Sequence, residues 1–360
     1  MADSRPSSNA TASSAAAAHR PSVNRQWVLR ERPVGRLARE CFECREALWQ
    51  APALDAGEIL VRNLVFQCAP TIRNWMNDAS RSYRASIGLG EPVVGPACVE
   101  VVQSAHPRYL TGSRLIAVSR WEDYTALRPD GMAIPAVPVP ISMSPVEALG
   151  VYGYNSLTAY FGLVRVARAL AGETLLVTAA AGSVGSVALQ IGRIIGCRAI
   201  GVAGGPEKCA WLREACGAED VIDYKAEDLD ERLADLAPAG VDVMFDNVGG
   251  LQLAAAIRHM APHGRIAVCG QVSAYDGDAP APGPPDMMRV VYGRLRIEGF
   301  VTGDFLKEAD ATRDEMARWV GEGRLLIATD VRHGFEQLPA AFVELFRGAN
   351  RGTLLVTADR

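Results

Sequence analysis

The chain has 360 residues, a net charge of −4, 49% hydrophobic residues and 22% charged residues. This is the ordinary composition of a globular domain, and the charge offers no attraction to nucleic acid or to an anionic membrane surface. No apolar run approaches the roughly 18 to 20 residues that cross a bilayer, and the length predicts two domains.

The first 22 residues are rich in Ser and Ala and contain almost no large apolar side chain. Such a segment buries too little surface to offset the entropy of ordering, so we expect a disordered tail over residues 1–22. An organelle transit peptide is the alternative, supported only by low acidity and by Arg5 and Arg20. Because no apolar signal region is present, we expect a cytoplasmic protein.

The eight cysteines form no disulfide framework, which favours a reducing compartment. Cys41 and Cys44 have the spacing of a zinc half-site, but no second half-site follows at usable spacing. The sequence therefore predicts no metal.

From about residue 25 to 145 the chain has short apolar runs broken by Gly, Pro and Asp. We expect strands over 58–69, 92–104 and 114–127, followed by a proline-rich extended segment over 133–141. This part is predicted to be a β-barrel-like or mixed sheet.

After residue 146 strands and helices alternate. Strands are predicted over 174–179, 198–204, 220–223, 241–248, 264–270 and 295–301, and helices over 184–196, 206–217 and 308–322. Repeated β-α-β units of this length predict an α/β fold with a doubly wound parallel sheet. Because the last residues return to β structure, we expect this Rossmann-like block to be inserted into the first, β-rich domain.

The segment VTAAAGSVGS (177–186) joins a predicted strand to a predicted helix. Ala180, Gly182 and Gly185 occupy the three places of a dinucleotide-binding fingerprint, and alanine stands at the place that tolerates a small side chain best. The helix that follows presents free backbone N–H groups to an anion. The segment is therefore predicted to be a pyrophosphate-binding turn.

The end of the second predicted strand bears on the choice of cofactor. Gly204 and Gly205 stand where NAD-binding folds place an Asp or Glu on the ribose 2′-hydroxyl. Two glycines leave room for a 2′-phosphate, and Lys208 is able to pair with it. Glu207 lies at the start of a helix, where it complements the helix dipole. NADPH is therefore expected rather than NADH.

Several stretches carry a family resemblance, in order and with matching spacing: SLTAYFGL (156–163), VTAAAGSVGS (177–186), GVAGGPEKCAWL (201–212), VIDYKAEDL (221–229), FDNVGG (245–250), VCGQVSAY (268–275) and GANRGTLLV (348–356). With them the chain resembles the medium-chain dehydrogenase/reductase superfamily, in its zinc-independent branch of prostaglandin reductases, leukotriene hydroxydehydrogenases and alkenal double-bond reductases. The resemblance implies a Rossmann domain over 147–316, a GroES-like catalytic domain over 23–146 and 317–360, and a homodimer.

The resemblance also implies which residues contact NADPH. They are Ala181, Gly182, Ser183, Val184 and Gly185 in the loop, Gly204, Lys208 and Tyr224 at the 2′-phosphate, Asn247, Cys269 and Ser273 along the dinucleotide, Phe300 and Val301 beside the nicotinamide, and Asn350 from the C-terminal segment. For Cys269 the alternative is a structural role in the core.

On the substrate side the resemblance is looser. Arg73 and Met76 stand where the family has its Arg- and Met-containing segment, and Arg73, Tyr152, Asn155 and Tyr275 are expected to line the substrate pocket. Zinc-dependent relatives carry a metal-binding Cys, a Gly-His-Glu segment and a four-cysteine lobe. Here Cys68 is a lone candidate and the other features are missing, so zinc is not expected.

A nicotinamide enzyme without metal suits hydride addition to an activated acceptor such as an enone, an enal or a conjugated polyene. By its family position Tyr275 is the expected catalytic residue, with its phenol on the developing enolate oxygen. The alternative for Tyr275 is a loop aromatic that shields the site, and the cofactor's ribose hydroxyl is a second candidate donor.

The sequence departs from the family around the substrate: Asn155 and Ser156 replace a Pro-Gly pair, and the loop after Tyr275 is rich in Pro and Gly. These departures favour a remodelled pocket, as in natural-product biosynthesis. A reductive cyclase, in which hydride addition triggers ring closure, stays open beside simple reduction. So do a quinone reductase and a non-catalytic NADPH-binding protein.

Overall fold

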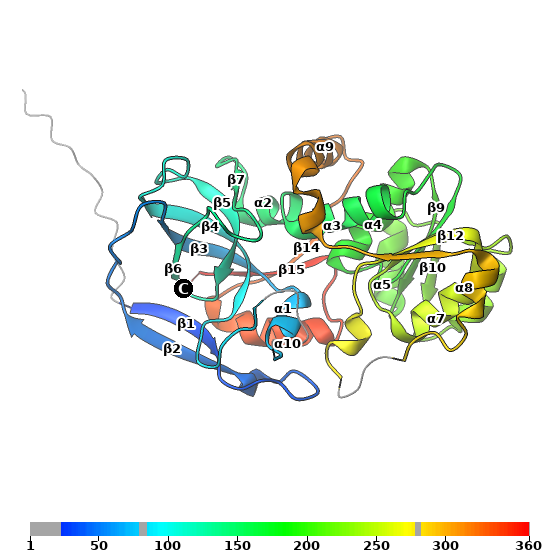
Figure 1. Ribbon diagram of the computed structural model, residues 1–360, viewed down its shortest axis with the longest axis horizontal. Coiled ribbons are helices and arrows are strands. Elements are labelled where there is room, and N and C mark those ends of the chain that lie inside the picture. The colour runs from blue at the N-terminus through cyan, green and yellow to red at the C-terminus, as the bar shows by residue number, and fades with distance from the viewer. Residues whose placement is uncertain (1–22, 79–84, 278–281, 360) are drawn as a thin grey trace, which may run out of the picture.

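The computed structural model describes residues 23–78, 85–277 and 282–359. The tail predicted for residues 1–22 lies outside this range and stays a prediction. Figure 1 shows a β-rich part at one end of the molecule and an α/β part at the other, with helices α1 (Thr71–Trp75) and α10 (Leu338–Phe346) between them. No helix among the described residues is long and apolar enough to cross a membrane.

The β-rich part is built on two sheets. Its strands are β1 (Val23–Leu29), β2 (Phe42–Leu48), β3 (Ile59–Gln67), β4 (Val94–Ser104), β5 (Arg114–Arg120), β6 (Tyr124–Leu127), β7 (Val137–Val139), β14 (Thr329–Arg332) and β15 (Thr353–Thr357). Strands β1 and β2 form an antiparallel pair, and the others form a sheet of order β14-β15-β3-β4-β5-β7, in which β6 also pairs with β3. The chain's last strands therefore return to the sheet of its first part.

One prediction in this part needs correction. The single strand expected over 114–127 is broken between β5 and β6, because Glu122 and Asp123 turn inward to bind Gln26 and Arg25 on β1. Of the segment 133–141 only β7 is a strand. Its prolines lack the N–H that a sheet ladder uses, which explains why β7 is short and lies at an edge.

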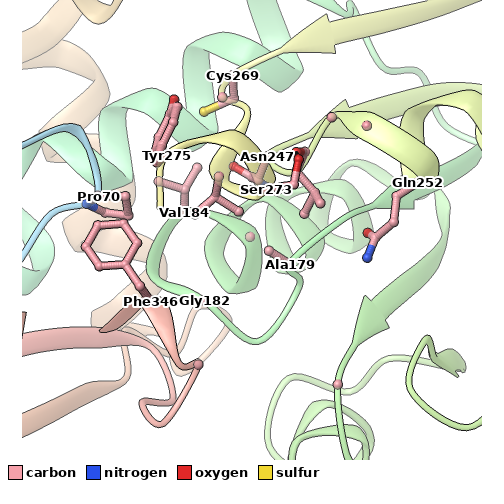
Figure 2. Close-up of a pocket in the computed structure, with 18 of the residues that line it drawn as sticks. Pro70, Ala179, Gly182, Val184, Asn247, Gln252, Cys269, Ser273, Tyr275 and Phe346 are labelled. Carbon is pink, nitrogen blue, oxygen red and sulfur yellow. Dashed lines mark hydrogen bonds between the residues drawn. The ribbon is translucent and has the colours of Figure 1, made fainter. Parts of the chain in front are cut away.

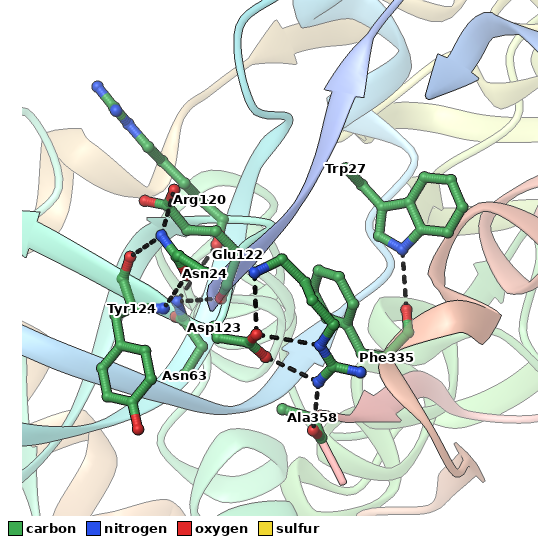
Figure 3. A network of polar contacts seen from close by, with 10 residues as sticks. Asn24, Trp27, Asn63, Arg120, Glu122, Asp123, Tyr124, Phe335 and Ala358 are labelled. Carbon is green, nitrogen blue, oxygen red and sulfur yellow. Dashed lines mark hydrogen bonds and ion pairs between the residues drawn. The ribbon is translucent and has the colours of Figure 1, made fainter. Parts of the chain in front are cut away.

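A polar network joins the first strand to the end of the chain (Figure 3). The Arg25 guanidinium donates to both carboxylate oxygens of Asp123, at 2.8 and 3.0 Å, and to the carbonyl oxygen of Ala358 at 3.5 Å. The indole N–H of Trp27 donates to the carbonyl of Phe335 at 3.0 Å. These contacts fix β1 against the C-terminal segment. Trp27 and Phe335 also belong to an apolar core that contains Phe42, Phe66, Trp121 and Phe342.

The α/β part has one parallel sheet. Its strands are β8 (Thr174–Val177), β9 (Arg198–Ala203), β10 (Asp220–Asp223), β11 (Val241–Asp246), β12 (Met260–Val268) and β13 (Arg296–Gly299), in the order β10-β9-β8-β11-β12-β13. Counted within this part, the order is 3-2-1-4-5-6, which defines the doubly wound Rossmann sheet and confirms the predicted fold class. The strand order reverses between β8 and β11, where such folds bind their ligands.

Alternating side chains bury both faces of this sheet. On β8, Leu175 and Val177 join one apolar cluster with helix α4 (Ser183–Ile195), whereas Leu176 joins a second cluster on the opposite face. Helix α4 ends at Gly196, whose φ of +104° suits glycine. The strand and helix predicted on either side of the glycine loop are thereby confirmed.

The remaining helices cover the sheets or join them. They are α2 (Pro145–Val151), α3 (Tyr154–Phe161), α5 (Pro206–Glu214), α6 (Leu229–Leu236), α7 (Gly250–His259), α8 (Met288–Gly293) and α9 (Ala309–Gly321), with short helical turns η1 (Arg39–Cys41), η4 (Val272–Ala274), η5 (Thr302–Glu308) and η6 (Phe335–Gln337) and a π-helical segment η3 (Gly162–Val166). A capping box at Ser144 and Glu147 begins α2. The domain limits expected at 146/147 and 316/317 stay a prediction.

Candidate active site

One cavity of about 1680 Å³ lies at the carboxyl ends of the parallel strands. Its wall includes residues that follow each of these six strands, together with residues from α1, α3, α10 and the segment before β15. Figure 2 shows part of this wall, with Asn247, Cys269, Ser273 and Tyr275 on one side and Pro70 and Phe346 on another. The cavity therefore lies where the α/β part meets the β-rich part.

The glycine loop after β8 forms the floor of the cavity. A Cβ on Gly185 would lie 2.2 Å from the carbonyl oxygen of Ala179, so only glycine lets α4 approach the strand this closely. The left-handed residue of the turn is Ala179, with φ of +47°, whereas Ala180 is fully buried without a positive φ. Position 180 therefore does not need the positive φ that favours glycine, which explains how this loop keeps its shape without the first glycine of the fingerprint.

The C-terminal segment locks onto this loop. Gly352 donates its N–H to the carbonyl of Ala181 at 2.9 Å, and Gly182 and Gly352 form a parallel bridge. The side-chain amide of Asn350 donates to the carbonyl of Gly352 at 2.9 Å. Asn350 thus lies on the cavity wall beside the loop, and its expected contact with NADPH stays a prediction.

A buried aspartate shapes the turn after β11. Its carboxylate, on Asp246, accepts hydrogen bonds from the hydroxyl of Thr178 at 2.9 Å and from the N–H groups of Val248 and Gly249 at 3.1 Å. Burial raises the pKa of Asp246, and these three donors oppose the rise. Asn247 donates its amide to the carbonyl of Thr178 at 2.7 Å. The turn is held rigidly where it meets the glycine loop.

A group of cations lies at the end of the cavity near β9 and β10. Two of the chain's three lysines, Lys208 and Lys225, line it. Burial lowers the pKa of Lys208, and the nearby charges of Lys225 and Arg351 lower it further, against a smaller opposing effect of Asp330. A bound anion would relieve this repulsion, as a 2′-phosphate does.

Gly204 and Tyr224 complete that end of the cavity. A Cβ on Gly204 would lie 2.8 Å from the Tyr224 ring and 2.9 Å from the Lys225 side chain, so a larger residue cannot fit without displacing them. The nearby carboxylate of Asp223 is occupied by the backbone N–H groups of Gly205 and Lys225, at 2.8 and 3.1 Å. These features fit a phosphorylated ribose.

The opposite end of the cavity holds the residues expected beside a nicotinamide. Phe300 packs edge-on against Phe245, and Val301 is exposed at the cavity wall. The Thr158 hydroxyl donates to the carbonyl of Tyr154 at 2.8 Å, so in its 2.7 Å contact with Thr302 it is the acceptor. Burial, followed by the charge of Asp246, raises the pKa of Cys269 to about 12, so this cavity-lining thiol is neutral rather than a thiolate nucleophile.

A chain of hydrogen bonds from Asn155 through Ser183 to Thr353 joins α3, α4 and β15. The Asn155 amide on α3 donates to the hydroxyl of Ser183 at 2.7 Å, and Ser183 lies 2.5 Å from the hydroxyl of Thr353 on β15. Both Asn155 and Ser183 line the cavity. Ser183 therefore ties α4 to the C-terminal strand, and Asn155, which stands where the family has a proline, ties α3 to α4.

Tyr275 lies just after η4, on the cavity wall (Figure 2). Its phenol oxygen accepts a hydrogen bond from the backbone N–H of Gln271 at 3.2 Å. That contact leaves the O–H proton available for donation. Ser273, in the same turn, donates its hydroxyl to the carbonyl of Val248 at 2.5 Å.

Two expected substrate contacts do not line the cavity. Arg73 is buried, and its guanidinium donates to the carbonyls of Pro33 and Gly35 and to the side chain of Asn77. Tyr152 packs against the apolar cluster that contains Leu149 and Leu355. The structure brings the other expected residues together in the one cavity but leaves these two outside it.

Sequence reasoning also missed several residues of the site. They are Thr178, Asp246, Lys225, Arg351, Thr302 and Thr353, with Thr71 and Asn74 from α1. A usable signal existed for some of them, because polar residues at the carboxyl ends of parallel strands gather at one edge. Among the described residues no group of three or more His, Cys, Asp or Glu side chains is placed to hold a metal ion.

Comparison with known proteins gives consistent matches. A family model described as "N-terminal domain of oxidoreductase" matches residues 25–134, and one described as "Zinc-binding dehydrogenase" matches residues 183–320. The chain is 35% identical to the NADPH-dependent curcumin reductase of Escherichia coli, over 92% of this chain and 96% of that protein. It is also 35% identical to prostaglandin reductase 1 of Bos taurus, over 93% and 99% of the two chains. The solved structure of CurA from Vibrio vulnificus in complex with NADPH superposes with a TM-score of 0.85 and 33% identity, over 93% and 99%.

Proposed function

Because the chain belongs to the zinc-independent branch of the medium-chain dehydrogenase/reductase superfamily, we propose that it is an NADPH-dependent reductase of conjugated carbon–carbon double bonds. The observation that carries the proposal is a single cavity with Lys208 near one end and Tyr275 near the other, joined by the glycine loop. The substrate class is an enone, an enal or a conjugated polyene.

The chain's own residues fit the cofactor along its length. Lys208, Tyr224 and the neighbouring cations would hold the 2′-phosphate, and Gly204 leaves room for it. The N-terminus of α4, at Ser183, would hold the pyrophosphate with its free N–H groups. Phe300 and Val301 would flank the nicotinamide.

When bound, NADPH would supply a hydride to the electrophilic β-carbon of the substrate. The enzyme's task is then to orient the acceptor and to stabilise the negative charge that develops on the carbonyl oxygen. The Tyr275 phenol suits this task because its oxygen already accepts from the Gln271 N–H and its own proton is available to the substrate. An accepted hydrogen bond also polarises the phenol and strengthens its donation.

We infer the finer identity of the substrate from the places where the sequence departs from the family around the site. Thr71 and Asn74 on α1, Asn155 on α3, and the proline-rich segment that includes Pro282 and Pro285 line the cavity. At about 1680 Å³ the cavity exceeds the 300–1,000 Å³ of most ligand pockets, which leaves room for an extended substrate beside a dinucleotide. These features support a natural-product intermediate rather than a small enal.

We also propose a homodimer that acts in the cytoplasm. Strand β13 is an edge of the parallel sheet, and Ile297 on it is exposed together with Met288, Val291 and Tyr292 on α8. An exposed edge with adjoining apolar side chains is typical of a pairing surface. All eight cysteines are unpaired, which supports a reducing compartment.

The test is NADPH consumption by the full-length protein with a panel of enones, enals, polyenes and quinones, each with identified products. We expect turnover of at least one conjugated carbonyl to its saturated product. Rapid quinone turnover without any enone reduction would reassign the protein to the quinone reductases. Tight NADPH binding without turnover of any acceptor would favour a non-catalytic role.

A further inference from the structure

The turn that carries Tyr275 is tied to the β-rich part of the molecule by the next residue. The carboxylate of Asp276 accepts a hydrogen bond from the backbone N–H of Leu37, 239 positions away in the chain. Leu37 is buried, only 4% exposed, in the apolar core that contains Trp27 and Phe42. The anchor on that side is therefore part of a packed core rather than a free loop.

A buried arginine stabilises the same anchor. The Arg73 guanidinium donates to the carbonyls of Pro33 at 3.3 Å and Gly35 at 3.1 Å, which holds the chain just before Leu37 against α1. No acidic side chain among the described residues forms an ion pair with Arg73, and the Asp276 carboxylate is close enough to act on it electrostatically. Asp276 therefore faces both a backbone donor and a buried positive charge.

On its other side the turn is held by the parallel sheet. Ser273 donates to the carbonyl of Val248, and Cys269 donates its N–H to the carbonyl of Asp246 at 2.8 Å. Tyr275 thus lies between two attachments, one to each part of the molecule. Without the bond to Leu37, the tyrosine would be held from the sheet side alone.

We infer that Asp276 is a positioning residue that fixes the Tyr275 phenol at the substrate's carbonyl oxygen through its bond to Leu37, with Arg73 holding the other side of that bond. The inference rests on the proposed function, because the position of the Tyr275 phenol matters for catalysis only if the enzyme reduces a conjugated carbonyl compound. It also assigns Arg73 a role outside the pocket, in place of the expected substrate contact.

The test compares Asp276→Ala with Asp276→Asn, whose side-chain oxygen can still accept from Leu37. We expect Asp276→Ala to lower kcat for an enone about tenfold, as a small misplacement of a catalytic group does. Asp276→Asn should stay close to wild type, and neither variant should change the Kd for NADPH. Asp286→Ala serves as the matched control, because the Asp286 carboxylate accepts a hydrogen bond from the nearby N–H of Met288 and does not line the cavity.

A double variant separates positioning from a general structural role. If Asp276 acts through the phenol, Asp276→Ala should have little further effect on kcat in a Tyr275→Phe background. Full kcat in Asp276→Ala, or independent multiplication of the two losses, would overturn the inference.

Hydrogen exchange at the Leu37 amide gives a readout that does not depend on catalysis. The protection of this amide should fall in Asp276→Ala and be retained in Asp276→Asn. Unchanged protection in both variants would contradict the hydrogen bond between Asp276 and Leu37. If the wild-type protein reduces no enone, the proposed function is wrong, and the bond between Asp276 and Leu37 has no catalytic role.

Discussion

Lys208 is the residue whose surroundings most directly indicate a phosphorylated ligand. It is half-buried, it has two further cations as neighbours, and no ion pair neutralises it within the described part of the chain. A half-buried cation among like charges is unfavourable unless an anion joins it. We therefore propose that this side chain and Gly204 determine the preference for NADPH over NADH.

Replacing Lys208 with Ala should weaken NADPH use selectively. We expect KM for NADPH to rise about 10- to 100-fold, because a hydrogen bond to a charged group contributes about 1.5–3 kcal/mol. kcat/KM with NADH should change little. Initial rates with both cofactors give the ratio of kcat/KM for NADPH to kcat/KM for NADH. Lys307→Ala is the control, because Lys307 is exposed and lies outside the cavity. An unchanged NADPH preference would place the 2′-phosphate elsewhere.

Replacing Tyr275 with Phe removes the proposed donor and keeps the ring. We expect kcat for an enone to fall about 10²-fold, the effect of removing one oxyanion donor, with the Kd for NADPH unchanged. Steady-state kinetics and fluorescence titration measure the two quantities, and Tyr152→Phe is the control, because Tyr152 packs against an apolar cluster outside the cavity. Full activity in Tyr275→Phe would mean that the ring only shields the site.

At this scale the sequence predicts residues near the ends of the parallel strands well and substrate contacts poorly. The residues proposed to bind the cofactor lie in motifs with fixed spacing, so their places on the cavity wall follow from the sequence. Arg73 shows the limit: on α1 the cavity is lined by Thr71 and Asn74, which are three residues apart and share a face, while Arg73 points to the chain before Leu37. Which face of a short helix meets a cavity depends on packing that no local motif encodes.

Among the elements, α4 and its loop depend on Gly185. A side chain there would meet the backbone of Ala179 and Ala180 within 3 Å, so the helix would have to move away from the strand. Any such movement also displaces Ser183, which bonds Asn155 and approaches Thr353. The position of this one helix therefore affects the cofactor site and the contact between the two parts.

Gly185→Ala tests this dependence. We expect the free energy of unfolding to fall by about 1–3 kcal/mol, the usual cost of overpacking, and NADPH affinity to fall at least tenfold. Thermal unfolding and NADPH titration measure these effects. Gly321→Ala in α9 is the matched control, because a Cβ there meets nothing within 4 Å. Equal behaviour of the two variants would contradict the proposed close approach.

Elements were predicted most accurately in the alternating part of the chain. Strand β10 coincides with its predicted range, and α4 and α9 each differ from theirs by one residue at each end. The break at Glu122 and Asp123 was missed because it depends on Asn24, Arg25 and Gln26, about a hundred residues earlier. Contacts over such separations leave no trace in local periodicity.

In the whole molecule, the last strands, β14 and β15, share one sheet with β3 to β7 from the first part of the chain, and the cavity lies between the β-rich part and the parallel sheet. The Arg25 network and the Gly182–Gly352 bridge join the C-terminal segment to both parts. The insertion of one fold into the other was predictable from the return of β structure after α9. The contacts between Asp276 and Leu37 were not, because neither residue belongs to a motif.

The proposed dimer is tested at the same scale. We expect the wild-type protein to have twice the mass of one chain. Val291→Asp places a charge among the exposed apolar side chains beside β13, so we expect this variant to be a monomer. Light scattering after size-exclusion chromatography measures the mass. Leu48→Asp is the control, since Leu48 is also exposed and lies on β2, in the β-rich part at the other end of the molecule. A monomeric wild type would contradict the homodimer.

The central claim is that hydride reaches the β-carbon of a conjugated carbonyl held near Tyr275. Its most direct test uses NADPH deuterated on one or the other face of the nicotinamide, with a reduced enone product examined by NMR. The account predicts deuterium at the β-carbon from one labelled form only, and a saturated ketone as product. Deuterium on the carbonyl carbon, with an allylic alcohol as product, would contradict it.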